Sequence, residues 1–347
     1  MQETDQHQHD ALRVTSSPQS PEHIPRHAPS APKVGLRSQL IAAVEAMRPK
    51  QWSKNGLLLL ALVFSRQLTD VTAVARVLLA FFAFSFAASA IYIVNDIADR
   101  ETDRIHPRKS LRPIASGRLP LRAAVATGVL CFLLSAVFTY WLVAHALPNV
   151  ADPFLRWGSA PRLFVATILG YVLLNLCYSF WLKHQVLWDI FIIAAGFVLR
   201  ALAGAFAIPV PISPWFYLCT TFLALFLALG KRRAELIMLS DEAVNHRKNL
   251  REYTVKLLDQ LMSVVVTCTL ITYSLYTFQG VNGSPALMVT IPFVLFGVFR
   301  YLYLMYVKNE GSNPEELLYR DKQIFASVAL CVVVVLLVLY AVPLLQR

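Results

Sequence analysis

Asp96, Asp99 and Asp103 lie at helical spacing just after a long apolar run. At 100° per residue the three side chains fall within an arc of about 60° on one face of a helix. Carboxylates this close repel one another, and one at the centre of a membrane span costs roughly 2.5–3.5 kcal/mol. A divalent cation relieves both problems, because Mg²⁺ is usually held by a few carboxylates together with phosphates and water. The aspartates are therefore candidate catalytic residues and magnesium ligands; the alternative is an exposed helix end paired with Arg100 and Arg104.

Basic residues lie near these aspartates in the chain, or reach the same side of the membrane in the topology given below. Lys and Arg bind phosphate through charge and, for Arg, through a planar fork of donors. Each one taken singly is more simply an anchor at the membrane surface, but their convergence with the acids favours a phosphate-binding site. These residues are Lys50, Lys54, Arg108, Lys109, Arg112 and Lys183.

Further charged residues interrupt or end later apolar runs. Asp189 and Arg200 are eleven residues apart, which places them on one helical face, about 16 Å apart along the axis. An arginine facing lipid is expensive, so we expect both to face one polar cavity; the alternative for Arg200 is a structural role, bonded to helix carbonyls. Lys231 and Arg232 end the next run and are interpreted either as membrane anchors or as substrate contacts.

The chain that must position these residues has 347 amino acids, of which 56% are hydrophobic and 15% charged. Soluble proteins are about 45–50% apolar and about 25% charged, so this composition excludes an ordinary soluble enzyme and favours an all-α membrane bundle. The net charge of +11 favours anionic headgroups or phosphorylated substrates as partners over nucleic acid. The five cysteines all lie in apolar runs, which predicts neither disulfides nor a zinc site.

Nine apolar segments have about the length needed to cross ~30 Å of hydrocarbon. They are residues 55–70, 73–95, 122–143, 163–181, 187–207, 214–230, 259–279, 286–306 and 323–343. The first is the weakest, because its apolar run from Leu57 to Phe64 is short. Seven basic residues follow the second segment and seven follow the sixth, so the even-numbered loops and the N-terminus are predicted to be cytoplasmic.

Residues 1–34 differ in composition from the rest, with five prolines, four of the eight histidines and few aliphatic residues. This composition predicts a disordered tail, and a solvated segment is favoured over a metal site at His7 and His9. The tail lacks the charged start, apolar core and cleavage site of a secretory signal. Residues 35–347 are then expected to form one transmembrane catalytic domain.

Several strings of this sequence resemble a known family. The run from Asn95 to Asp103, together with the nine predicted helices, resembles the first aspartate motif of the UbiA superfamily of intramembrane prenyltransferases. The strings at 95–117, 48–55 and 230–235 look like the decaprenyl-phosphate phosphoribosyltransferase branch of that superfamily. The resemblance covers nearly the whole chain after residue 40.

The resemblance implies a UbiA-like bundle in a bacterial cytoplasmic membrane, with Mg²⁺ as cofactor. It implies transfer of phosphoribose from 5-phosphoribosyl diphosphate (PRPP) to a polyprenyl phosphate, with release of pyrophosphate. It adds Asn55, Asn95 and Tyr178 to the residues expected to contact substrate. Superfamily members commonly carry a second acidic motif after the fourth span, where this chain offers only Tyr178, Lys183 and Asp189. A second metal, an orienting role and a pairing with Lys183 all stay open for Asp189.

In both prenyl and phosphoribosyl transfer, diphosphate leaves a carbon that develops positive charge, so the enzyme must neutralise the diphosphate. A phosphate acceptor is already ionised at pH 7 and needs no strong base. The many bases suit the four phosphoryl groups of PRPP and a lipid phosphate, and prenylation of an aromatic acceptor is the alternative. A transporter is disfavoured, because the sequence contains neither an internal repeat nor paired broken helices; a lipid-binding scaffold would need no divalent metal.

Overall fold

The computed structural model describes residues 35–106, 109–150, 158–238, 252–279, 285–310 and 314–342, without the side chains of His184, Pro314 and Glu315. The interpretations of residues 1–34 as a disordered tail and of Arg108 as a phosphate ligand lie outside the described residues. The chain divides into Met1–Gly35 and a larger unit, Leu36–Arg347, to which all the helices belong.

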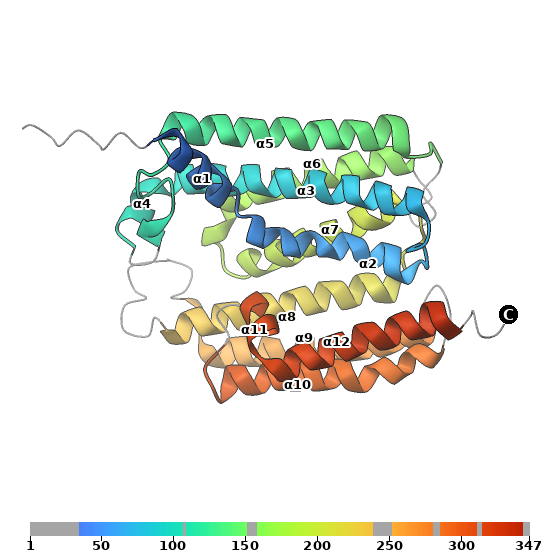
Figure 1. Ribbon diagram of the computed structural model, residues 1–347. Coiled ribbons are helices and arrows are strands. Elements are labelled where there is room, and N and C mark those ends of the chain that lie inside the picture. Colours follow the sequence, from blue (N-terminus) through green and yellow to red (C-terminus); the bar gives the residue numbers. More distant parts are fainter. Residues whose placement is uncertain are drawn as a thin grey trace, which may run out of the picture. The chain divides into compact units, whose positions relative to one another are not determined.

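The described residues are almost entirely helical, which confirms the predicted all-α class (Figure 1). Long apolar runs favour helices in lipid, because a helix satisfies its backbone hydrogen bonds within its own segment. The α-helices are α1 (Leu36–Met47), α2 (Leu57–Phe64), α3 (Val71–Ala98), α4 (Arg100–Arg104), α5 (Leu121–Trp141), α6 (Ala160–Phe180), α7 (Trp188–Ala207), α8 (Pro214–Met238), α9 (Val255–Gln279), α10 (Ile291–Tyr306), α11 (Pro314–Arg320) and α12 (Lys322–Leu336). The shorter 3-10 and π segments are η1 (Pro49–Gly56), η2 (Lys109–Leu111), η3 (Leu142–Ala146), η4 (Leu182–His184), η7 (Pro285–Thr290) and η8 (Leu337–Ala341).

Eight helical segments among the described residues are long and apolar enough to cross a membrane, and they match the second to ninth predicted spans. The first span differs from its prediction at 55–70, because α2 has only 8 residues and continues the 8-residue 3-10 helix η1. A 3-10 helix rises about 2.0 Å per residue, so η1 and α2 in series approach the ~30 Å of the hydrocarbon core. The composite helix therefore covers residues 49–64, and the chain turns at Arg66, whose φ is 59°.

The helices pack in two groups that meet where α7 contacts α8 and where the end of α2 packs against α12 and η8 (Figure 1). Buried apolar clusters lie between α2, α3, α6 and α7 in one group and between α8, α9 and α10 in the other. At Gly204 of α7, a Cβ would lie 2.3 Å from the carbonyl oxygen of Leu58 in α2. Only glycine permits this approach, as is common where membrane helices cross closely.

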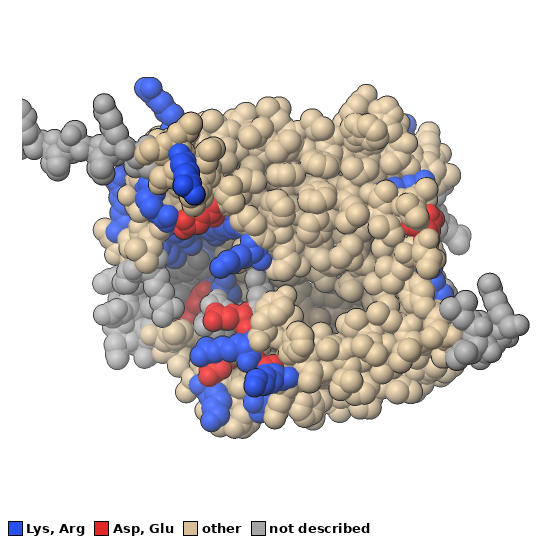
Figure 2. All heavy atoms as spheres, viewed as in Figure 1, with Lys and Arg blue, Asp and Glu red and all other residues tan. Residues whose placement is uncertain are grey.

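Charged side chains are unevenly distributed over the molecule. Figure 2 shows Lys, Arg, Asp and Glu gathered at the end where α3 and α8 end, with a broad uncharged surface beside them. The same view shows a hollow between α2 and the α8–α12 group, with charged residues at one end of the hollow. The fold therefore places a polar end next to an apolar, lipid-facing wall.

Candidate active site

The aspartate run lies at the end of α3, where the helix is interrupted. Asp96 belongs to α3, Asp103 belongs to α4, and Asp99 lies between them. The backbone N–H of Asp99 donates to the carbonyl of Asn95, and that of Asp103 donates to the carbonyl of Asp99, so the chain keeps its helical direction. Asp96 and Asp103 are 2% and 1% exposed, so two ionisable side chains are buried at the polar end.

Arginine and lysine side chains compensate the two buried carboxylates. Nη1 of Arg112 lies 3.0 Å from Oδ1 of Asp96 and 2.6 Å from Oδ2 of Asp103, so one nitrogen bridges both. Nη2 of Arg48 donates to Oδ1 of Asp96 at 2.6 Å, and Nζ of Lys109 lies 3.9 Å from Oδ1 of Asp103. A buried carboxylate needs such partners, because leaving one uncompensated costs several kcal/mol.

Asp99 has a different basic partner from the other two aspartates in this structure, and its place as a third metal ligand stays a prediction. Its carboxylate accepts a 2.8 Å hydrogen bond from Nζ of Lys183, which follows α6. The reason is the interruption of the helix at Asp99 together with a cation brought close by α6. Within the described ranges, no three His, Cys, Asp or Glu side chains are grouped closely enough to hold a metal ion. The alternative, an exposed helix end paired with Arg100 and Arg104, also differs from the structure, because Arg104 pairs with Glu101.

The donor set at Asp96 and Asp103 nonetheless fits a divalent cation. A positively charged nitrogen already lies within 3.0 Å of an oxygen of each carboxylate. Carboxylate oxygens sharing one cation are the ligands that Mg²⁺ takes in proteins, with phosphates and water completing its shell. Asp99, one helical turn from each of the two, carries the third carboxylate of the run.

A second polar cluster surrounds Asp189, which is fully buried at the start of α7. Nε of Arg232 lies 2.8 Å from Oδ2 of Asp189, and the Tyr253 hydroxyl donates to Oδ1 at 2.8 Å. Arg232 also pairs through Nη1 with Glu235. The Tyr253 hydroxyl in turn accepts from the backbone N–H of Leu187 at 2.7 Å. Asp189 is therefore held by Arg232 of α8 and by Tyr253, two positions before α9 begins, and Lys183 pairs with Asp99 instead.

Burial raises the pKa of the Tyr253 hydroxyl, and the neighbouring Asp189 carboxylate raises it further. The hydroxyl therefore keeps its proton at neutral pH and stays a hydrogen-bond donor to Asp189. Tyr253 had no signal in the sequence, since it belongs to no motif. Arg48 had a signal in the sequence, because it belongs to the string at 48–55. Its contact with Asp96 could not be predicted from that string, because the two residues are forty-eight positions apart.

Lys231 brings further residues to the second cluster. Its ammonium group interacts electrostatically with Lys54, Arg232, Glu235 and Tyr178. Lys54 comes from η1 and Lys231 from α8, and Tyr178, from α6, also interacts with the Arg232 guanidinium. Four predicted substrate-binding residues, separated by up to 178 positions in the sequence, therefore lie in one neighbourhood.

Arg200 and Asn55 form a separate buried network. Nε of Arg200 donates to Oδ1 of Asn55 at 2.7 Å, and Nη2 donates to the Tyr171 hydroxyl at 2.8 Å. Nη1 donates to the carbonyl of Gly196, and Nδ2 of Asn55 donates to Oγ of Ser85. The network joins η1, α3, α6 and α7. Arg200 thus has the helix-carbonyl bond of the structural alternative and does not share a network with Asp189; its contact with substrate stays a prediction.

The other predicted contacts are at the same polar end. Lys50 is exposed on η1, and Asn95 is half-buried in the last turns of α3. Their contacts with substrate stay predictions.

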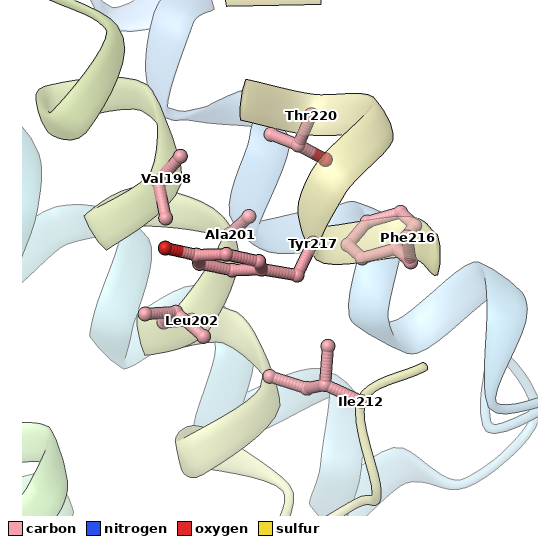
Figure 3. A pocket seen from close by; sticks show the side chains of 7 residues that line it. All are labelled: Val198, Ala201, Leu202, Ile212, Phe216, Tyr217 and Thr220. Atoms are coloured by element: carbon pink, nitrogen blue, oxygen red, sulfur yellow. The ribbon is translucent and has the colours of Figure 1, made fainter. Parts of the chain in front are cut away.

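An apolar pocket lies between α7 and α8, away from the charged end (Figure 3). Its space, including the open side, is about 190 Å³. The Tyr217 ring lies across the pocket toward Ala201 and Leu202 of α7. The remaining lining residues are Val198, Ile212, Phe216 and Thr220.

Comparison with known proteins gives one consistent family. The model of the UbiA prenyltransferase family matches residues 57–327. The chain is 34% identical over 311 residues to the decaprenyl-phosphate phosphoribosyltransferase of Mycolicibacterium smegmatis, covering 84% of this chain and 90% of that protein. It is 32% identical over 308 residues to the protein of the same name from Corynebacterium glutamicum, covering 86% and 87%. A UbiA homologue from Archaeoglobus fulgidus bound to GPP and Mg²⁺ has the same fold, with a TM-score of 0.62, 17% identity and coverage of 86% and 99%.

Proposed function

The chain belongs to the UbiA prenyltransferase family, and we propose that it is an integral membrane transferase that moves 5-phosphoribose from PRPP to a polyprenyl phosphate. The observation that carries this proposal is identity of 32–34% over most of the chain to relatives named for that reaction. The buried Asp96–Arg112–Asp103 grouping supports it, because the same polar end holds both the acids for a metal and the bases for phosphates.

The reaction requires the diphosphate of PRPP to leave the anomeric carbon. The acceptor phosphate oxygen forms a bond to that carbon while the carbon–oxygen bond to diphosphate breaks, and its electron pair departs on pyrophosphate. A dianionic phosphate acceptor has no proton to lose, so no general base is required in this step. The main task of the protein is positioning and electrostatic stabilisation.

We propose that Asp96 and Asp103, with Asp99, would hold Mg²⁺ at the end of α3. When bound, the metal supplies charge to the departing diphosphate. Arg112 and Arg48, which compensate Asp96 in this structure, are then available as donors to phosphate oxygens. Lys183, which pairs with Asp99, is a third donor of this kind, from the connection between α6 and α7.

The hollow between α2 and the α8–α12 group supports access for a lipid substrate (Figure 2). Its charged end suits a phosphate headgroup, and its uncharged walls suit an isoprenoid chain. The apolar pocket at Tyr217 offers further apolar surface toward the other end of α7 and α8. We also propose that residues 1–34 form a separate tail and that residues 35–347 act as one catalytic domain.

The experiment that tests the function gives purified full-length protein in nanodiscs two substrate pairs with Mg²⁺. The pairs are PRPP with decaprenyl phosphate, and a polyprenyl diphosphate with 4-hydroxybenzoate. We expect pyrophosphate release from the first pair only. Release from the second pair alone would assign the chain to aromatic prenylation, and release from neither would remove the proposed activity.

A further inference from the structure

Among the described residues, two separate groups of basic side chains at the polar end concern the site. In the first, Arg48, Arg112, Lys109 and Lys183 each pair with an aspartate of the 96–103 run. The second surrounds Lys231 and holds Lys54, Arg232 and Tyr178.

The two groups differ in the number of their carboxylates and in how these are paired. The first contains three carboxylates, which suits a metal-loaded diphosphate. In the second, Asp189 and Glu235 both pair with the same residue, Arg232. Glu235 also acts electrostatically on Lys231, which is exposed, but among the described residues no carboxylate oxygen is found at ion-pair distance from the Lys231 ammonium group. This group therefore suits an anion that brings no metal with it.

The second group is a built site rather than a scatter of surface lysines. The side chain of Arg232 is 2% exposed, and its Nε is held in place by an ion pair with the fully buried Asp189. Tyr253 fixes Asp189 in turn, at 2.8 Å. Three helices, α6, α7 and α8, together with η1, contribute to the group, so its geometry is set by the bundle and not by one loop.

The second group also has the position that a lipid phosphate requires. Lys54 comes from η1, which leads directly into α2, and Lys231 comes from the end of α8. The hollow in Figure 2 lies between α2 and the α8–α12 group, with charged residues at its end. A headgroup bound between η1 and α8 would leave its hydrocarbon chain in that hollow.

From these observations we infer that Lys54, Lys231 and Arg232, with Tyr178, bind the phosphomonoester of the polyprenyl acceptor. This inference rests on the proposed function and deepens it. The donor diphosphate then belongs to the aspartate group, and the acceptor phosphate oxygen approaches the anomeric carbon from the Lys231 side. The same chemistry exists in the 5-phosphate of PRPP, so the experiment must separate the two sources.

The test compares Lys231→Met with Lys322→Met, which removes an exposed lysine at the start of α12. Binding of farnesyl phosphate to the full-length protein in nanodiscs is measured without PRPP and in EDTA. Wild type and Lys322→Met should bind, because the group needs no metal, whereas Lys231→Met should bind at least about tenfold more weakly. Lys231→Arg keeps the charge and should restore binding, which separates loss of contact from misfolding.

Steady-state kinetics distinguish the two phosphomonoesters. Lys231→Met should raise the KM for farnesyl phosphate and leave the KM for PRPP unchanged. A raised KM for PRPP with unchanged farnesyl phosphate binding would overturn the inference, although the proposed function would stand. Conversely, absent turnover in the wild type with Lys231-dependent farnesyl phosphate binding would remove the proposed function and keep the site.

A double-mutant cycle gives a further readout. If Lys54 and Lys231 contact one phosphate, the losses of affinity in Lys54→Met and Lys231→Met should not add in the double variant. Additive losses would mean that the two lysines act on different groups and would contradict a shared site. Tyr253→Phe tests the support behind Arg232: it should weaken farnesyl phosphate binding while leaving the KM for PRPP unchanged.

Discussion

At the scale of single residues, the polar end is organised by charge compensation. Asp96 and Asp103 are almost fully buried, and Arg112 contributes one nitrogen to both. An uncompensated charge in such a place is strongly destabilising, so the basic residues have a structural task before any substrate arrives. The same guanidinium and ammonium groups match phosphate oxygens, which is why a phosphate-transfer site can be built from residues that also stabilise the fold.

The first prediction concerns the aspartates as metal ligands. Asp96→Asn or Asp99→Asn should lower turnover on the order of 10²–10³-fold or more, because each removes negative charge needed to bind the metal. The measurement is pyrophosphate release from PRPP and decaprenyl phosphate by protein of matched yield. Asp70→Asn is the control, since Asp70 caps α3 at its other end and asparagine also caps helices. Normal turnover in either active-site variant would contradict the metal role.

Metal binding itself gives a second prediction, with a readout other than activity. Mg²⁺ at about a hundredfold above its dissociation constant should stabilise the wild type by about 2.7 kcal/mol. The apparent Tm in detergent should rise with Mg²⁺, return to its starting value with EDTA, and not respond in Asp96→Asn. A rise of equal size in that variant would place the bound ion elsewhere.

At the scale of the elements, the site depends on a few close contacts between helices. Helix α2 is short and approaches α7 at Gly204, and this contact sets the position of η1 with Lys54 and Asn55. Helix α1 is tied to the loop that carries Arg112, because Arg118 of that loop forms a bidentate pair with Glu45. Movement of either element would therefore displace residues at the polar end.

The third prediction concerns Gly204. Gly204→Ala should destabilise the protein by about 1–3 kcal/mol, because the new methyl group would meet the backbone of Leu58. The matched control is Gly170→Ala in α6, where a Cβ meets nothing within 4 Å. That substitution should leave the apparent Tm unchanged or raise it slightly, since alanine is the better helix former. Equal Tm values for both variants would contradict the close approach of α2 and α7.

The fourth prediction concerns the pH dependence of the Glu45–Arg118 pair. The hydrogen bond from Arg118 lowers the pKa of Glu45 from its ordinary value of 4.5. The pair therefore stabilises the folded state fully above about pH 4.5 and loses this contribution as the pH falls through the lowered pKa.

The measurement compares the apparent Tm of the wild type with that of Glu45→Gln across pH. The difference should correspond to about 0.2–1 kcal/mol at neutral pH, because the pair is exposed. It should shrink at pH values below 4.5. A Tm difference between the two proteins that grows as the pH falls would contradict the assignment of this pH dependence to Glu45.

At the scale of the whole molecule, the distribution of charge predicts an orientation in the membrane. Helices α3 and α8 both end at the charged end, and the sequences that follow them are rich in lysine and arginine. Retention of basic loops in the cytoplasm favours an orientation in which the active site opens to that side. Water-soluble PRPP and a membrane-embedded lipid phosphate can then meet at one boundary.

The fifth prediction tests that orientation. Lys322→Cys, at the start of α12, should react with a membrane-impermeant maleimide only when the cytoplasmic side is accessible. Val150→Cys, in the connection before α6, should react only from the opposite side. Labelling of spheroplasts and of inverted vesicles gives the two measurements. The reverse pattern would place the active site outside the cytoplasm.

The helical class, eight of the spans and the polar end could be predicted from the amino-acid sequence. These follow from local properties, because hydropathy and helical periodicity act over about twenty consecutive residues and the positive-inside rule acts on the adjoining loops. The strings around Asp96 and Lys231 also indicated the family, which the comparisons confirm. The bounds of the composite first span could not be predicted in this way, because an apolar run does not specify where a 3-10 helix passes into an α-helix.

The pairing of acids with bases, by contrast, depends on how the helices pack in three dimensions. Asp99 pairs with Lys183, 84 positions away, and Asp189 is held by Arg232 and Tyr253. Sequence periodicity places a residue on a helix face, but the rotation and height of the neighbouring helices are set by packing contacts such as the one at Gly204. Electrostatic partners are chosen across those contacts, so the three aspartates of one run could take basic partners from different elements.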